Sequence, residues 1–371
     1  MDITKQQEIK KWFDENKVKY INFKKFEDDI RKEPYVTLFN KTLHSCMFND
    51  CCYPPIRSHV FQEKGVMKSV SKNSRVYKPF YDDDSHSLIL KDVTIGGNSA
   101  RFWGFCDKHD KIFEEFESRK LLINEKDFTL QIYRCICREL SQIKDVIKAN
   151  NILYYKIDKQ IKKDVSNACL QHISEIAQDN DAILYLDNLV QTAVENCLVP
   201  VKQMNVKFER QRDKIYRMYC LMMKRITAKK YSFKDLYKDF YIKHISISNN
   251  TLPICVSCFV ASINKKSKKL SYNLVLVISF PNGDNQEIIF FSLKSDANYA
   301  LSFFNKKDMT DNDYIQLLEK ITLTNANFWF LNPSYYDSLS DIQRAELNTK
   351  ISQGVFEHNM NTIGDVFNFE I

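Results

Sequence analysis

The chain has 371 residues, of which 44% are hydrophobic and 27% charged, so it can bury a core and is not a disordered tail. Its 7 glycines form neither GxGxxG nor GxxxxGK[ST]. Dinucleotide-binding and P-loop folds are therefore disfavoured, because their phosphate cradles need glycine where the backbone approaches the ligand. The net charge of +7 permits an anionic partner without requiring one.

The cysteine content and the hydropathy pattern predict the compartment. The 11 cysteines are too dilute for a disulfide scaffold, and Met1–Lys11 lacks a charged-then-apolar leader. No apolar run approaches the roughly 20 residues that a membrane span needs. We therefore expect a cytoplasmic protein with no membrane segment.

The first third of the chain is expected to hold a site. The first forty residues predict a short amphipathic helical segment without visible chemistry. From residue 42 to about 117, cysteines, histidines and turn signals gather around strand-like pieces at 87–90 and 100–105.

The middle of the chain is expected to be helical. Apolar residues at three- and four-residue spacing predict helices over Glu125–Asn150, Lys156–Gln178 and Asp181–Cys197. Pro200 interrupts this pattern, and a basic helix follows over about Lys202–Lys230. We expect an arm or an oligomerisation element here, which makes a homo-oligomer one expected state.

The last third mixes strands and helices. The predicted strands are Ile254–Ile263, Leu270–Phe280, Glu287–Leu293 and Ala326–Leu331, with a turn at 281–284, and the predicted helices are Asp296–Phe304, Asp311–Ile321 and one from Ser340. We expect an α+β fold of three parts: a metal-stabilised domain at 1–120, a helical segment at 121–230 and an α+β domain at 231–371.

Two short-spaced pairs of metal-preferring side chains stand in the first part. Cys46 and Cys51 form one pair, and Cys106 and His109 form the other. Thiolate and imidazole are the ligands that four-coordinate zinc prefers, and two local turns can each supply half of a tetrahedron. We predict a structural zinc site from these four residues, with Cys52 open as an alternative to Cys51. The competing interpretation is incidental buried thiols.

The order of these residues resembles a known family. Cys-x4-Cys, then Ser58-His59, then Phe-Cys-Asp-Lys-His-Asp at 105–110 before a helical run resembles the zinc-containing HNH group of the ββα-metal nucleases, which have a treble-clef-like fold. It also resembles a group of bacterial HNH-like proteins of poorly defined function that are suspected of roles in anti-phage defence. The resemblance covers about Leu43 to Glu117.

The resemblance implies an endonuclease site. It implies that His59 is the general base toward water and that Asp110 helps to hold a catalytic Mg²⁺ or Mn²⁺ ion, with Glu114 one helical turn further on. Ser58 departs from the pattern, since active members usually place an acidic or imidazole ligand there. Asn98 is a candidate for the middle Asn of the motif.

Each of these residues also has a simpler interpretation. His59 could cap the hairpin or bind zinc in place of His109. Asp110 and Glu114 could only stabilise a helix start, where carboxylates are favoured without any metal. The acidic run with a histidine at 82–86 is more typical of a solvated loop than of a metal site.

The segment Lys202–Lys243 is strongly basic. It carries thirteen Lys and Arg against four Asp and Glu, which leaves +9, more than the net charge of the whole chain. Aromatic residues are interleaved with these cations, so the segment is a candidate for DNA or RNA binding through phosphate contacts and base stacking. Alternatively, the aromatics pack into a core and the lysines form its exposed face.

Two functions follow from these patterns. The first is an HNH-like, metal-dependent nucleic-acid phosphodiesterase. The second is a non-catalytic, zinc-stabilised nucleic-acid- or protein-binding module in a defence complex, with a co-encoded protein partner. The remaining cysteines, including Cys135, Cys255 and Cys258, are expected to pack in the core.

Overall fold

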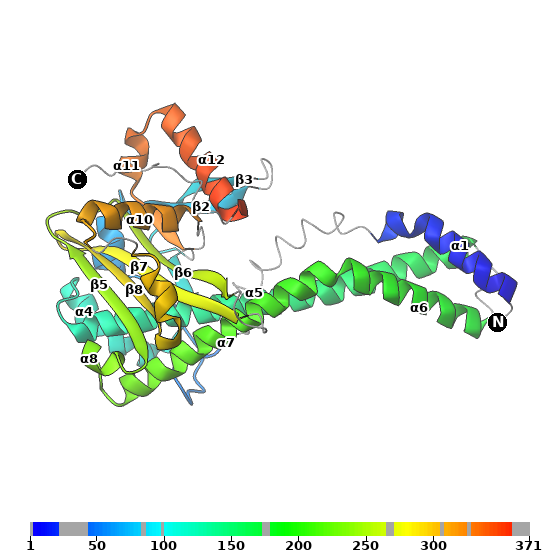
Figure 1. The fold of residues 1–371 in the computed structure, drawn as a ribbon, viewed down its shortest axis with the longest axis horizontal. Coiled ribbons are helices and arrows are strands. Elements are labelled where there is room, and N and C mark those ends of the chain that lie inside the picture. Colours follow the sequence, from blue (N-terminus) through cyan, green and yellow to red (C-terminus); the bar gives the residue numbers. More distant parts are fainter. Residues whose placement is uncertain are drawn as a thin grey trace. The chain divides into compact units, whose positions relative to one another are not determined.

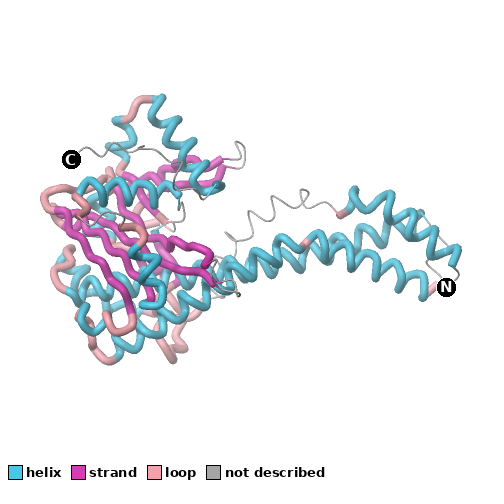
Figure 2. Tube along the Cα trace, in the orientation of Figure 1, coloured by secondary structure: helices cyan, strands magenta, loops and turns pink. Residues whose placement is uncertain are grey.

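The structure is a computed structural model that describes residues 3–21, 44–82, 87–97, 100–172, 179–264, 271–304, 308–324 and 328–357. These residues form a mixed α+β fold with antiparallel sheets, as expected (Figure 1). Figure 2 shows the same trace by secondary structure. Among the described helices, none combines the length and apolar character needed to cross a membrane.

The chain divides into two compact units. The helical unit comprises residues 1–43 and 142–212, and the sheet unit comprises residues 44–141 and 213–371. This division differs from the boundaries predicted near 120 and 230. Two long helices, α5 (Glu125–His172) and α7 (Val199–Thr227), continue from one unit into the other, so the units do not end where the helices end.

Helix α5 (Glu125–His172) is a single element where the sequence pattern predicted two. No glycine or proline stands between its ends, so nothing in the backbone interrupts it near residues 150–156. The end of the second predicted helix, at 173–178, lies outside the described residues.

The helical unit is built from α1 (Ile3–Tyr20), the later part of α5, α6 (Asn180–Cys197) and the first part of α7 (Val199–Thr227). The Asp179 side chain caps α6 by accepting hydrogen bonds from two backbone N–H groups. Pro200 stands in the first turn of α7, where its missing N–H costs no helical hydrogen bond. One apolar cluster joins α1, α5 and α6; it comprises Ile9, Trp12, Phe13, Leu153, Ile157, Ile161, Val165, Cys169, Ala182, Leu186, Val190, Val194 and Leu198.

The sheet unit contains a seven-stranded antiparallel sheet with the order β3-β2-β9-β6-β7-β8-β5. Its strands are β2 (Arg75–Asp82), β3 (Ser87–Thr94), β5 (Phe240–Ile247), β6 (Ile254–Asn264), β7 (Ser271–Asn282), β8 (Asn285–Leu293) and β9 (Trp329–Leu331). The predicted turn between β7 and β8 is confirmed: it is a two-residue turn in which Gly283 adopts φ +65°.

Helices cover both faces of this sheet. The helices that follow its strands are α8 (Phe233–Leu236), α9 (Ala297–Leu301), α10 (Asp311–Thr324), α11 (Pro333–Ser338) and α12 (Asp341–Glu357). On β6, Val256 and Cys258 pack in one cluster with Leu318 of α10. On the other face of β6, Cys255 and Ser257 interact with Cys135 of α5. These three cysteines are buried, which confirms their predicted place in the core.

The part that carries the four predicted metal ligands is joined to this sheet through an insertion between β1 and β4. A two-stranded antiparallel sheet pairs β1 (Arg57–His59) with β4 (Arg101–Trp103), and α3 (Asp107–Asp110) and α4 (Glu114–Arg119) follow. Between β1 and β4 the chain forms the short π-helix η3 (Glu63–Met67) and the β2–β3 hairpin. Because β2 pairs with β9, residues predicted to form separate N- and C-terminal domains share one sheet.

Candidate metal centre and the adjacent histidine

The four predicted metal ligands come from two places in the sheet unit. Cys46 and Cys51 lie in the loop before β1, whereas Cys106 is the residue before α3 and His109 lies within it. Antiparallel pairing of β1 with β4 brings the two places together.

Backbone contacts continue this pairing toward the ligands. The Met47 N–H donates to the Gly104 carbonyl, and the Ile56 N–H donates to the Phe105 carbonyl, each at 2.8 Å. A Cβ atom at Gly104 would lie only 2.7 Å from the Phe102 ring. The same Cβ atom would lie 3.0 Å from the Cβ atom of Ser58 on the paired strand, so the close approach of the two segments favours glycine at this position.

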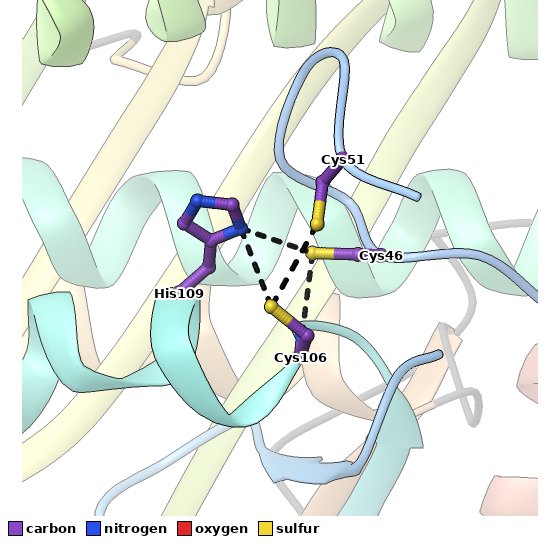
Figure 3. Close-up of side chains that lie close together, drawn as sticks. All are labelled: Cys46, Cys51, Cys106 and His109. Carbon is purple, nitrogen blue, oxygen red and sulfur yellow. Dashed lines mark hydrogen bonds between the residues drawn. The ribbon is translucent and has the colours of Figure 1, made fainter. Parts of the chain in front are cut away.

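The ligand atoms of Cys46, Cys51, Cys106 and His109 all lie within 4.8 Å of one another (Figure 3). The His109 Nδ1 atom lies 3.5 Å from the Cys46 sulfur and 3.4 Å from the Cys106 sulfur, and the sulfurs of Cys51 and Cys106 are 3.7 Å apart. Ligands at zinc bond lengths in a tetrahedron are separated by about 3.5–3.8 Å. The cluster therefore fits a four-coordinate metal ion such as zinc.

This geometry also decides between two adjacent thiols. Cys51 belongs to the cluster, whereas Cys52 is exposed and does not. The same geometry assigns His109 to the cluster, so the interpretation in which His59 replaces it is not supported.

The electrostatic surroundings of the sulfurs are unequal. Burial raises the pKa of the Cys46 thiol to about 12. Burial also acts to raise the pKa of Cys106, but hydrogen bonds from the His109 backbone and from the Cys51 and Cys46 thiols outweigh it and lower that pKa. The His109 ring stacks on Phe48, with 4.1 Å between the ring centroids, and this contact restricts its orientation.

Two buried tyrosines hold the loop that carries the first ligand. The hydroxyl of Tyr133 on α5 donates to the Met47 carbonyl at 3.2 Å, and the hydroxyl of Tyr219 on α7 donates to the same carbonyl at 2.7 Å. Met47 directly follows Cys46. The position of that sulfur therefore depends on two helices far from it in sequence.

His59 lies at the end of β1 in a cluster of charged side chains. Its Nε2 atom accepts a hydrogen bond from Arg101 Nε at 2.9 Å and lies 2.5 Å from Glu63 Oε2. Arg101 also bonds Glu63, at 3.0 Å from Nη2 to Oε2. Burial, together with the charge of Arg101, lowers the pKa of His59, although Glu63 acts in the opposite direction.

The predicted partner carboxylates occupy different surroundings. Among the described residues, the polar contacts of His59 are with Glu63 and Arg101, and Asp110 is not one of them. The Oδ1 atom of Asp110 is buried and has no hydrogen-bond partner in this part of the chain. Glu114 is exposed at the start of α4.

Two carboxylates near His59 were missed by the sequence reasoning. Glu63 follows His59 by only four residues, and this short separation along the chain could have pointed to it. Glu117 lies on α4, one turn beyond Glu114, and its charge acts on His59. It pairs with the buried Arg134 of α5 at 2.7 Å. No sequence signal connects Glu117 with Arg134, because the two residues meet only through the packing of α4 on α5.

The remaining candidates carry less chemistry. Ser58 is buried, and its hydroxyl accepts a hydrogen bond from the Phe105 N–H at 3.1 Å, so it stabilises the pairing of β1 with β4. Asn98 and residues 83–86 of the acidic run lie outside the described residues.

Comparison with known proteins identifies no relative on which to base a function. No protein-family model, no curated protein and no solved structure matches the chain. The function must therefore be argued from the chemistry of the two clusters themselves.

Proposed function

We propose that this protein is a metal-dependent phosphodiesterase that hydrolyses DNA or RNA, with an HNH-like ββα unit formed by β1, β4 and the helices that follow. Cys46, Cys51, Cys106 and His109 would hold a structural zinc ion, because a closed set of three thiolates and one imidazole leaves no open position for a substrate. The reaction would take place at His59.

The observation that carries this proposal is the pair of contacts at His59 Nε2. In the neutral ring this atom accepts from Arg101, and after protonation it can donate to the Glu63 carboxylate. The lowered pKa of His59 favours the neutral form near pH 7. A neutral imidazole with a carboxylate ready to stabilise its protonated form suits a general base toward water.

The arginine would link substrate binding to the base. A phosphate group that binds the Arg101 guanidinium competes with His59 for its N–H groups and so releases the Nε2 lone pair. Asp110 and Glu114 are the candidate ligands for Mg²⁺ or Mn²⁺, which would supply Lewis-acid stabilisation of charge on the phosphate. Among the described residues only the Cys46, Cys51, Cys106 and His109 set converges on one point, so the substrate phosphate would have to complete such a site.

A cleavage assay with Mg²⁺ or Mn²⁺ on single- and double-stranded DNA and RNA tests this proposal. We expect His59→Ala to lower the rate by at least about 100-fold, since general base catalysis contributes that much or more. Its zinc content should equal that of the wild type. His172→Ala, which changes an exposed histidine on α5, is the matched control and should cleave normally. Normal cleavage by His59→Ala would refute the proposal.

A second candidate is favoured by the same contacts. Because Arg101 and Glu63 already engage His59 Nε2, the cluster could be a stable ionic network without catalysis. The protein would then be a zinc-stabilised nucleic-acid- or protein-binding module in a cytoplasmic defence complex. Absence of cleavage by the wild type, alone or with a co-encoded partner, would support this candidate.

A further inference from the structure

The strongly basic segment at 202–243 is divided by the fold. Its residues up to 212 belong to the helical unit, and those from 213 belong to the sheet unit. Within the sheet unit, Lys214 pairs with the buried Asp296 at 2.7 Å, and Arg225 pairs with Asp239. These two cations therefore serve the fold.

Six other cations of this part of the segment are exposed, and none of them forms an ion pair with a described residue: Arg217, Lys224, Lys229, Lys230, Lys234 and Lys238. They are distributed along the second half of α7, the turn after it, and α8 with the residues next to it. Arg217 and Lys224 are seven residues apart on one helix, so they lie on the same side, about 10 Å apart along its axis. Such an excess of unpaired cations attracts a polyanion.

Two exposed tyrosines are sequence neighbours of these cations: Tyr216 precedes Arg217, and Tyr237 precedes Lys238. Tyr216 is 50% exposed and Tyr237 is 49% exposed. Tyr216 adjoins Arg217 and stacks on Tyr219, with 5.9 Å between the ring centroids. Tyr219 in turn bonds the carbonyl next to the metal ligand Cys46. This surface is therefore anchored to the loop of the metal centre.

We propose that these six cations with Tyr216 and Tyr237, here called the α7–α8 surface, bind single-stranded nucleic acid. Lysine and arginine neutralise backbone phosphates with release of counterions, and exposed tyrosines stack on bases that are not paired. Stacking requires unpaired bases, so the aromatic residues favour a single strand over a duplex. The proposal rests on the proposed function and names the substrate strand and its binding surface.

The test measures binding of a fluorescent single-stranded oligonucleotide to full-length protein by anisotropy, in a His59→Ala background that prevents cleavage. The test variant carries Lys224→Gln, Lys230→Gln and Lys234→Gln. The control carries Lys10→Gln, Lys11→Gln and Lys159→Gln, which remove the same charge from exposed positions of the helical unit. Affinity is measured from about 50 to 200 mM salt, because phosphate contacts appear in the salt dependence.

We expect the test variant to bind about tenfold more weakly and to lower the slope of log affinity against log salt by about 2, since each phosphate contact on a single strand contributes about 0.7. The control should keep the wild-type slope. Tyr237→Ala should weaken binding of the strand by about tenfold, because an unpaired base loses its stacking partner, without weakening binding of a duplex.

Three results would overturn the proposal: an equal loss in the control, a preference for duplex over single strand, or binding to phosphatidylserine vesicles without binding to the oligonucleotide. The failures of the two proposals are distinguishable. If the wild type cleaves nucleic acid but the test variant binds the oligonucleotide with unchanged affinity, only the proposal of the α7–α8 surface is rejected. Binding with the expected pattern but without cleavage rejects only the phosphodiesterase.

Discussion

Pairing of β1 with β4 positions both the metal centre and the His59 cluster, but the two differ in how the charges of their side chains are neutralised. At the metal centre, three thiols and an imidazole converge without a charged side chain among them. At His59, the charges of Glu63 and Arg101 neutralise each other directly. The first arrangement needs a cation to be stable as thiolates, whereas the second is stable without one. Removing metal should therefore affect the two clusters very differently.

The largest expected effect is at the metal ligands. Cys51→Ser should abolish zinc binding and lower the free energy of unfolding by at least about 3 kcal/mol, because a structural zinc site contributes on the order of 10 kcal/mol. Elemental analysis of protein purified without added metal, combined with urea unfolding, measures both quantities. Cys52→Ser is the control and should keep one zinc per chain. If the two variants lost zinc equally, the assignment of Cys51 would be wrong.

A smaller effect is expected at the tyrosines that hold the metal loop. Tyr219→Phe should lower the free energy of unfolding by about 1 kcal/mol, and adding Tyr133→Phe should cost more, because the Met47 carbonyl then loses both donors. Tyr237→Phe, at an exposed position, is the control and should change stability by less than about 0.5 kcal/mol. An unchanged stability in the double variant would show that water replaces both hydroxyls.

The smallest effect concerns pH. The pKa of His59 is lower in the folded protein than in the unfolded chain. As the pH falls below about 6.5, His59 therefore binds a proton more readily in the unfolded chain than in the folded protein. His59 therefore contributes to the loss of stability in acid, and this loss develops between its unfolded pKa and its lower folded value. His59→Gln should show a smaller decrease in the free energy of unfolding between pH 7.5 and 5.5 than the wild type. A larger decrease would contradict the sign of this shift.

The sequence alone predicted the candidate metal ligands, except for the choice between Cys51 and Cys52, and it predicted most helices and strands. Cys46 with Cys51 or Cys52, and Cys106 with His109, are each separated by few residues, so spacing and ligand chemistry together pointed to these side chains. Hydrophobic periodicity similarly located α6 and the strands around the turn at Gly283, because these patterns repeat within a single element.

Only the tertiary structure decided which groups surround His59. Arg101 lies 42 residues from His59 in the sequence and reaches it through the pairing of β1 with β4. Arg134, whose charge also acts on His59, comes from helix α5. The entry of the β2–β3 hairpin into the C-terminal sheet, and the choice of Cys51 over Cys52, also depend on contacts between distant segments. Local spacing carries information about residues within one turn or element, whereas these contacts arise from packing that no local pattern encodes.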